Sequence, residues 1–116
     1  MLYGQTPDVL LRVSTPFGGG VGLTEKELCG VLSGGVILIG SLLGRISPAT
    51  SDDEVQALAE TWRRQFHRAM GATICEDLRA TLPNEPNRCR PVVGRGVGLL
   101  LDLLEDYVAE APYRLR

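Results

Sequence analysis

The sequence has little with which to build several common kinds of functional site. Its 116 residues include three cysteines and one histidine, and twelve Lys and Arg are balanced by fourteen Asp and Glu. No strongly basic surface is therefore available to grip nucleic-acid phosphates. No C-x-x-C pair is present, which excludes a thioredoxin motif and a zinc knuckle. The cysteine count is odd and too low for the disulfide scaffold of a small secreted domain.

Long apolar runs are also missing. The longest uncharged run, residues 28–44, is broken by five glycines, and it is shorter than the ~20 mostly apolar residues that span a membrane. The chain begins without the basic segment of an export signal. We therefore expect a cytoplasmic protein with no membrane and no nucleic-acid partner. Its thiols should stay reduced there unless they cycle.

Helix signals dominate what is present, and they predict an all-α, single compact domain of about five helices over residues 1–116. The clearest signal is the amphipathic pattern of Val55, Leu58, Trp62, Phe66 and Met70, with apolar residues three and four apart. Capping boxes mark further helix starts. The predicted helices run from Pro7 (with Val9, Leu10 and Val13 inward) to Pro16, from Thr24 to Leu43, from Ser51 to Gly71, from Thr73 past Leu78, and from Pro91 to Pro112. A buried strand is the alternative for residues 36–39.

Glycines mark expected close contacts. Gly30 and Gly34 lie one helical turn apart, and Gly94, Gly96 and Gly98 recur in the last helix, so we expect these two helices to pack tightly against each other. A separate glycine cluster fills the loop before the second helix. Because that loop leads toward a helix N-terminus, which attracts anions, the residues we consider for cofactor binding are Gly18, Gly19, Gly20 and Gly30. The alternative is a loop that packs tightly and binds nothing. The loop lacks both the P-loop pattern and G-x-G-x-x-G.

Two cysteines stand near predicted helix starts. Cys75 is the second residue of the helix capped by Thr73, and Cys89 stands just before Pro91 between two arginines, Arg88 and Arg90. The positive end of a helix and nearby cations both favour the thiolate, which is the reactive form. Cys29 is expected about a turn and a half inside the glycine-rich helix. The alternative for all three is a free thiol that fills core space.

The arrangement of these residues resembles a known family. Phe17-Gly-Gly-Gly20 is followed by Cys29-Gly30-Val31-Leu32-Ser33-Gly34, then by Gly71-Ala72-Thr73-Ile74-Cys75-Glu76-Asp77-Leu78, and then by Cys89 before a closing helix. This order resembles the C-GCAxxG-C-C family of small redox-active proteins, from about residue 17 to residue 110. The resemblance implies an all-helical domain with redox-active cysteines, some members carrying selenocysteine at such a position. Cys29, Cys75 and Cys89 match the later three motif cysteines. The first motif cysteine has no counterpart in residues 2–13, and Val31 replaces a small residue.

We therefore expect a thiol-redox protein in which Cys29, Cys75 and Cys89 are catalytic, with Cys75 and Cys89 as the preferred disulfide pair. An alternative is a metal or iron–sulfur site held by the same three cysteines, completed by His67, water or a neighbouring subunit. His67 is otherwise expected to be a solvated or partly buried helix residue. A second alternative is a non-catalytic helical module that binds a partner protein or forms a homo-oligomer. The redox partner protein is not identified by the sequence.

Overall fold

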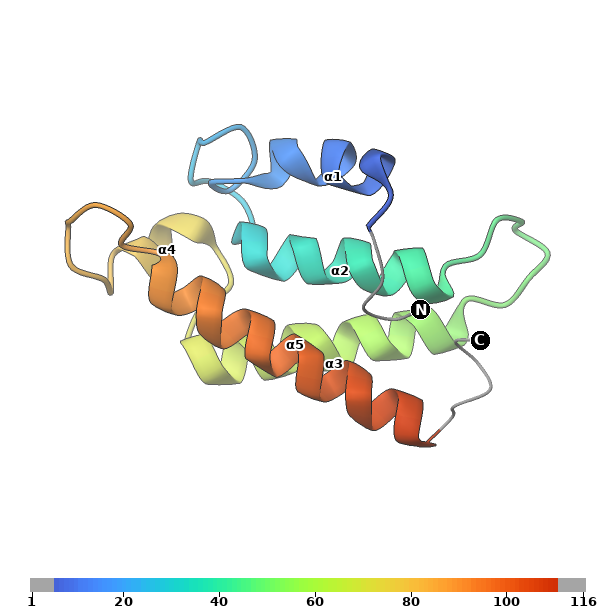
Figure 1. Cartoon of the computed structure of the whole chain (residues 1–116). Coiled ribbons are helices and arrows are strands. Elements are labelled where there is room, and N and C mark those ends of the chain that lie inside the picture. The colour runs from blue at the N-terminus through green and yellow to red at the C-terminus, as the bar shows by residue number, and fades with distance from the viewer. Residues whose placement is uncertain (1–5, 111–116) are drawn as a thin grey trace.

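The computed structural model describes residues 6–110, which form five α-helices, and all-α architecture is confirmed (Figure 1). The helices are α1 (Asp8–Ser14), α2 (Gly30–Leu43), α3 (Asp53–Met70), α4 (Cys75–Arg79) and α5 (Arg90–Glu110), and a short 3₁₀ helix, η1 (Thr15–Phe17), follows α1. Helices α2, α3 and α5 contact one another, and α1 lies along α2. Within residues 6–110 the only extended pairing is a single antiparallel bridge between Leu28 and Ile74.

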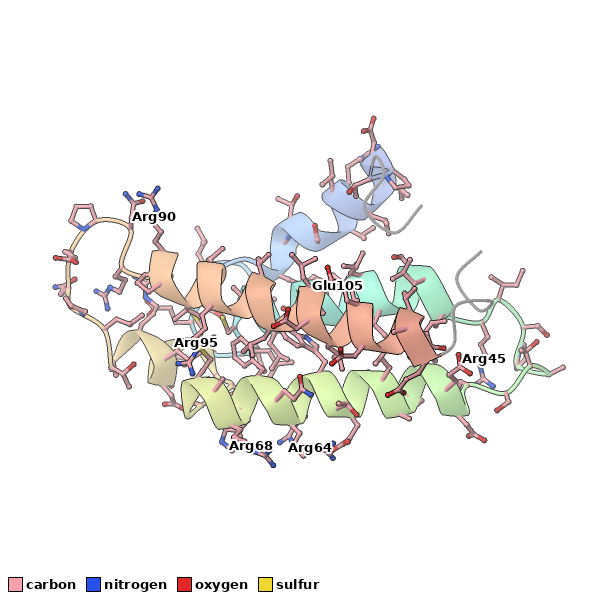
Figure 2. The ribbon with its side chains drawn as sticks, turned by 60° about the horizontal axis from the view of Figure 1, so that its bottom comes forward. Arg45, Arg64, Arg68, Arg90, Arg95 and Glu105 are labelled. Carbon is pink, nitrogen blue, oxygen red and sulfur yellow. The ribbon has the colours of Figure 1, made fainter. Side chains whose placement is uncertain are left out.

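The core lies where the three long helices meet, and its centre is Trp62 on α3. Trp62 and Phe66 are fully buried with their rings 5.6 Å apart in an edge-to-face arrangement. The indole Nε1 of Trp62 donates a hydrogen bond of 2.9 Å to the Leu32 carbonyl on α2, which satisfies a polar group that would otherwise be costly to bury. The charged residues of α3 point the other way, as Arg64 and Arg68 show in Figure 2. The predicted amphipathic pattern of α3 is confirmed.

Close helix packing is present, but mostly at other glycines than those predicted. A Cβ at Gly35 would lie 2.3 Å from Trp62 Nε1, and a Cβ at Gly96 would lie 2.4 Å from Val31 Cγ1. By contrast, a Cβ at Gly34, Gly94 or Gly98 would meet no atom within 4 Å. The prediction that α2 and α5 pack against each other at Gly34 is therefore wrong. Gly96 against Val31 makes that contact.

The prediction for the second helix start is wrong. Helix α2 begins at Gly30, not at the Thr24 capping box, because Thr24 Oγ1 bonds back to the carbonyls of Gly20 and Val21. Residues 25–27 form bends and not a helix, and the backbone groups of residues 25–29 pair with residues 73–76. Cys29 is consequently the residue that precedes α2 and does not lie inside it.

The other predicted helix ends are close to the structure. Helices α3 and α4 begin two residues after Ser51 and Thr73, and Gly71 ends α3 with a φ of 85°, the left-handed cap expected of a glycine. Helix α5 begins beside Pro91. The inward face predicted for α1 is wrong for Val9 and Val13, which are 61% and 47% exposed, whereas Leu10 is half-buried. No helix in residues 6–110 is both long enough and apolar enough to cross a membrane.

Candidate active site

The pairing between residues 25–29 and 73–76 brings two of the cysteines together. Cys29 N donates to Thr73 O at 2.8 Å, and Cys75 N donates to Glu27 O at 2.9 Å, on either side of the Leu28–Ile74 bridge. In an antiparallel ladder, residues placed in this way lie diagonally across from each other on one face. Such diagonal neighbours have Cα atoms about 7–8 Å apart, and their side chains can meet. The chain therefore folds so that Cys29 and Cys75 share one side of the paired segments.

The third cysteine comes from the loop before α5. Cys89 directly precedes this helix, and its carbonyl accepts a hydrogen bond from Val93 N. All three cysteines line one cavity of about 600 Å³ and are present as free thiols. The remaining lining residues are Ser14, Gly18, Gly19, Leu23, Gly30, Val31, Gly34, Gly35, Arg79, Val93, Gly96, Val97 and Leu100. Residues that are remote along the chain thus converge on a single space between α1, α2, α4 and α5.

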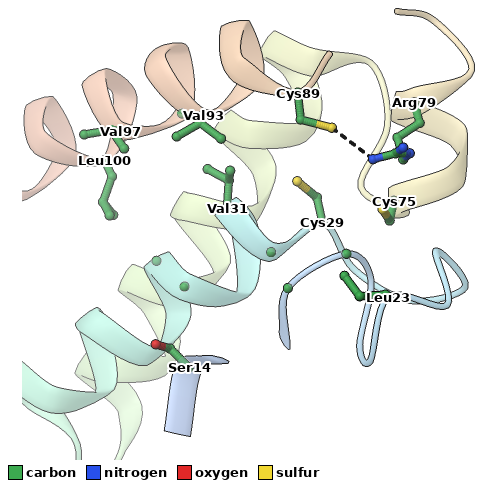
Figure 3. A pocket seen from close by; sticks show the side chains of 16 residues that line it. Ser14, Leu23, Cys29, Val31, Cys75, Arg79, Cys89, Val93, Val97 and Leu100 are labelled. Atoms are coloured by element: carbon green, nitrogen blue, oxygen red, sulfur yellow. Dashed lines mark hydrogen bonds between the residues drawn. The ribbon is translucent and has the colours of Figure 1, made fainter. Parts of the chain in front are cut away.

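The sulfur atoms gather at one end of this cavity, beside a guanidinium group (Figure 3). Arg79 Nη1 donates to Cys89 Sγ at 3.6 Å. Arg79 Nε lies 2.8 Å from Glu25 Oε1 in an ion pair, although the angle is poor for a hydrogen bond and Nε is otherwise unsatisfied. The ion pair holds the guanidinium between Glu25 and the cavity. Arg79 therefore places a hydrogen-bond donor directly beside the Cys89 sulfur.

Sequence reasoning did not identify Arg79 or Glu25. Arg79 is the last residue of α4, four residues after Cys75, and this spacing could have placed it on the same helix face. Glu25 carried no signal, because its place depends on the loop that replaces the predicted helix start. The two arginines that flank Cys89 in the sequence, Arg88 and Arg90, make no hydrogen bond to its sulfur among the described contacts. Arg88 bonds to the Arg79 carbonyl and to the side chain of Asn84, whereas Arg90 is exposed at the start of α5 (Figure 2).

The expectation that a helix terminus activates Cys75 is wrong. Burial raises the pKa of the Cys75 thiol, and the neighbouring Cys29 and Glu25 raise it further, while Arg79 lowers it. Only 6% of Cys75 is exposed, so the loss of hydration outweighs the field of a helix of five residues. Cys75 is therefore a protonated thiol at neutral pH, while Cys29 and Cys89 are both partly exposed.

The glycines considered for cofactor binding separate into two groups. Gly18, Gly19 and Gly30 line the cavity, whereas Gly20 is buried behind it and is not among the lining residues. Gly20 has a φ of +71°, and a Cβ there would lie 2.6 Å from Cys75 Cβ. Its role in the structure is to let the loop pass directly against Cys75.

The metal interpretation finds no support in the described part of the chain. No group of three or more His, Cys, Asp or Glu side chains within residues 6–110 is arranged to hold a metal ion. His67 is exposed near the end of α3 and does not line the cavity with the cysteines.

Comparison with known proteins agrees with the motif. The model of the family described as "Putative redox-active protein (C_GCAxxG_C_C)" matches residues 1–103. No curated protein and no solved structure matched the chain. The family match covers most of the sequence and includes all three cysteines of the cavity. The chain therefore belongs to the C_GCAxxG_C_C family of redox-active proteins.

Proposed function

We propose that this protein is a thiol oxidoreductase in which cavity cysteines alternate between two thiols and one disulfide. The observation that carries the proposal is the convergence of Cys29, Cys75 and Cys89 on one cavity with Arg79 bonded to the Cys89 sulfur. Free thiols that only fill a core have no need of a cation or an open cavity. A redox centre needs both, because the thiolate must be stabilised and must also be reached.

Cys89 is the attacking thiol in this proposal. It is partly exposed, it receives the Arg79 hydrogen bond, and it also lines a second, outer hollow of about 420 Å³ together with Asn87, Arg90 and Val93. An oxidised substrate can therefore approach its sulfur from either side. The Cys89 thiolate attacks the substrate, and a second thiol displaces the product to form an intramolecular disulfide. Two thiols lose two electrons and two protons, and the substrate accepts the electrons.

Cys29 is the resolving thiol that the geometry favours. Its sulfur is directed toward the same end of the cavity as that of Cys89 (Figure 3), and it is more accessible than Cys75. The raised pKa of Cys75 keeps this third thiol protonated, so it is a poor initial nucleophile. It can enter later by exchange with Cys29, its diagonal neighbour. A second exchange would then form the disulfide between Cys75 and Cys89, which is the pair preferred from the sequence.

Peptide mapping after mild oxidation tests this proposal. Diamide treatment of the dilute protein should give one intramolecular disulfide that includes Cys89, and Cys89→Ser should remove that disulfide. In Cys29→Ser the bond should move to Cys75. A protein that gives only intermolecular disulfides, or none, would contradict the proposal and would favour a structural role for these thiols.

The role of Arg79 is tested by alkylation of the native protein with iodoacetamide. A hydrogen bond to a charged group contributes about 1.5–3 kcal/mol, but Arg79 is 32% exposed, and screening reduces this to roughly 1 kcal/mol. Arg79→Gln should therefore slow Cys89 labelling by about fivefold. Arg90→Gln is the matched control, because Arg90 is adjacent in sequence but makes no hydrogen bond to the sulfur among the described contacts. Equal effects of the two variants would exclude a specific role for Arg79.

A further inference from the structure

The cavity is larger and more apolar than exchange between thiols requires. Beyond the sulfurs it continues along α2 and α5, where its walls are Val31, Val93, Val97 and Leu100. A volume of about 600 Å³ is in the range of pockets that enclose small organic molecules. Figure 3 shows the three cysteines and Arg79 together at one end, with Leu23 beside them, while Val31, Val93, Val97 and Leu100 lie toward the other part, at whose far end is the Ser14 hydroxyl. The ligand that matches this division has an apolar body with one polar, reactive end.

The floor of the apolar part is open. Gly34 lines the cavity, and a Cβ at this position would meet no atom within 4 Å. The space above Gly34 is therefore not filled by a neighbouring side chain. Val93 and Val97 on the opposite wall are 46% and 47% exposed. Within residues 6–110 this apolar surface is therefore accessible.

The reactive end carries a nucleophile and a cation at adjacent positions. Arg79, oriented by its ion pair with Glu25, bonds to the Cys89 sulfur. The same guanidinium can stabilise an oxygen on which negative charge develops as the sulfur attacks. This requirement is met by an oxidant whose leaving group is an alkoxide. A hydroperoxide also has its entire apolar body on one side of the O–O bond, which matches a cavity whose thiols and cation stand at one end and whose valine and leucine side chains continue from there.

We infer, on the basis of the proposed thiol chemistry, that the substrate is an apolar organic hydroperoxide whose hydrocarbon body lies over Gly34 and against Val93 and Val97. The Cys89 thiolate attacks the terminal oxygen. The O–O bond breaks, an S–O bond forms, and the alkoxide takes a proton from solvent and leaves as the alcohol. The Cys29 thiol then attacks the sulfenic acid, which forms a disulfide and releases water. An external dithiol reduces the disulfide and restores both thiols.

The test compares three oxidants on the full-length protein: cumene hydroperoxide, hydrogen peroxide and diamide. The rate of disulfide formation is followed by quenched-flow alkylation and mass spectrometry, with dithiothreitol as the reductant for turnover. We expect cumene hydroperoxide to react at least tenfold faster than hydrogen peroxide. Equal or slower reaction with cumene hydroperoxide would overturn the assignment. If diamide still gives the intramolecular disulfide, the proposed function survives that result, whereas failure with all three oxidants rejects both.

A blocking variant tests where the apolar body binds. Gly34→Leu should lower the ratio of the cumene hydroperoxide rate to the hydrogen peroxide rate by about tenfold, because the new side chain projects into the cavity from a position whose Cβ has open space. Gly40→Leu is the matched control: Gly40 is on the same helix, is exposed and has equally open space, but does not line the cavity. An unchanged ratio in Gly34→Leu would contradict the assignment.

A second measurement uses the unsubstituted protein and does not depend on the folding of a variant. Cumyl alcohol, the product of the proposed reaction, should inhibit the reaction with cumene hydroperoxide competitively and leave the reaction with diamide unaffected. Absence of inhibition up to millimolar concentration would exclude the cavity as the binding site for the apolar body.

Discussion

Replacement of Gly20 by alanine is expected to damage both the fold and the redox site. A Cβ at this position would lie 2.6 Å from Cys75 Cβ and 2.9 Å from the Glu25 Cα, and the backbone φ is +71°. The left-handed backbone costs a side chain about 1–2 kcal/mol. Overpacking against neighbours that cannot move costs a further ~1–3 kcal/mol. The expected loss of unfolding free energy is therefore about 2–5 kcal/mol, which is a large share of the total stability of such a domain.

Gly22→Ala is the matched control for the backbone contribution. Gly22 has a φ of +62°, but a Cβ there would meet no atom within 4 Å, so only the backbone cost of about 1–2 kcal/mol should appear. Urea unfolding can be followed by the fluorescence of Trp62, the single tryptophan. A difference of about 2 kcal/mol between the variants would separate their midpoints by about 1 M urea. Gly20→Ala should also expose Cys75 to alkylation.

The outcome that would refute this reasoning is an equal midpoint shift in Gly20→Ala and Gly22→Ala with no change in Cys75 labelling. That result would mean that the loop can move away from Cys75 at no cost. The close approach of the loop would then not be what keeps this thiol buried.

Three further predictions concern packing and protonation. Gly35→Ala should lower the free energy of unfolding in urea by about 1–3 kcal/mol, because it drives a Cβ into the Trp62 indole. Gly34→Ala on the same helix should raise the free energy of unfolding by up to ~1 kcal/mol. Equal effects of the two variants would disprove the contact with Trp62. Trp62→Phe removes the donor to the Leu32 carbonyl and should cost about 1–3 kcal/mol in unfolding followed by circular dichroism, and a neutral result would mean that the bond adds nothing. Because burial raises the pKa of Cys75, the folded state holds this proton more tightly than the unfolded chain, so the stabilising contribution is complete below the ordinary thiol range and is lost as pH rises through the raised value. The unfolding free energy of the wild type relative to Cys75→Ala should therefore decrease in alkaline solution, and a constant difference across that range would contradict the shift.

Helices α3 and α5 could be predicted from the sequence because their signals are local. The apolar spacing from Val55 to Met70 and the cap at Gly71 depend only on neighbouring residues, and α3 follows them. Pro91 likewise marks the start of α5. These elements could be found because the same residues that favour the helix also form its buried face.

The start of α2 and the environment of the cysteines could not be found in this way. Thr24 and Glu27 have the spacing of a capping box, but the backbone around them bonds to residues 73–76, which are remote in sequence. That pairing satisfies backbone N–H and C=O groups that would otherwise bond within a helix, and it places Cys29 at the edge of the cavity. The protonation of Cys75 was misjudged for a related reason, because its burial depends on the approach of Gly20. Local spacing carries no information about either contact.

The antiparallel contact at Leu28 and Ile74 has a consequence for how oxidation and folding influence each other. Because Cys29 and Cys75 become neighbours only through this contact, an unfolded chain holds its sulfurs no closer than any random polymer does. In a thermodynamic cycle, the free energy by which the native fold favours a disulfide equals the free energy by which that disulfide stabilises the fold against unfolding. Across a series of variants, the reduction potential should therefore fall as the melting temperature of the oxidised form rises further above that of the reduced form.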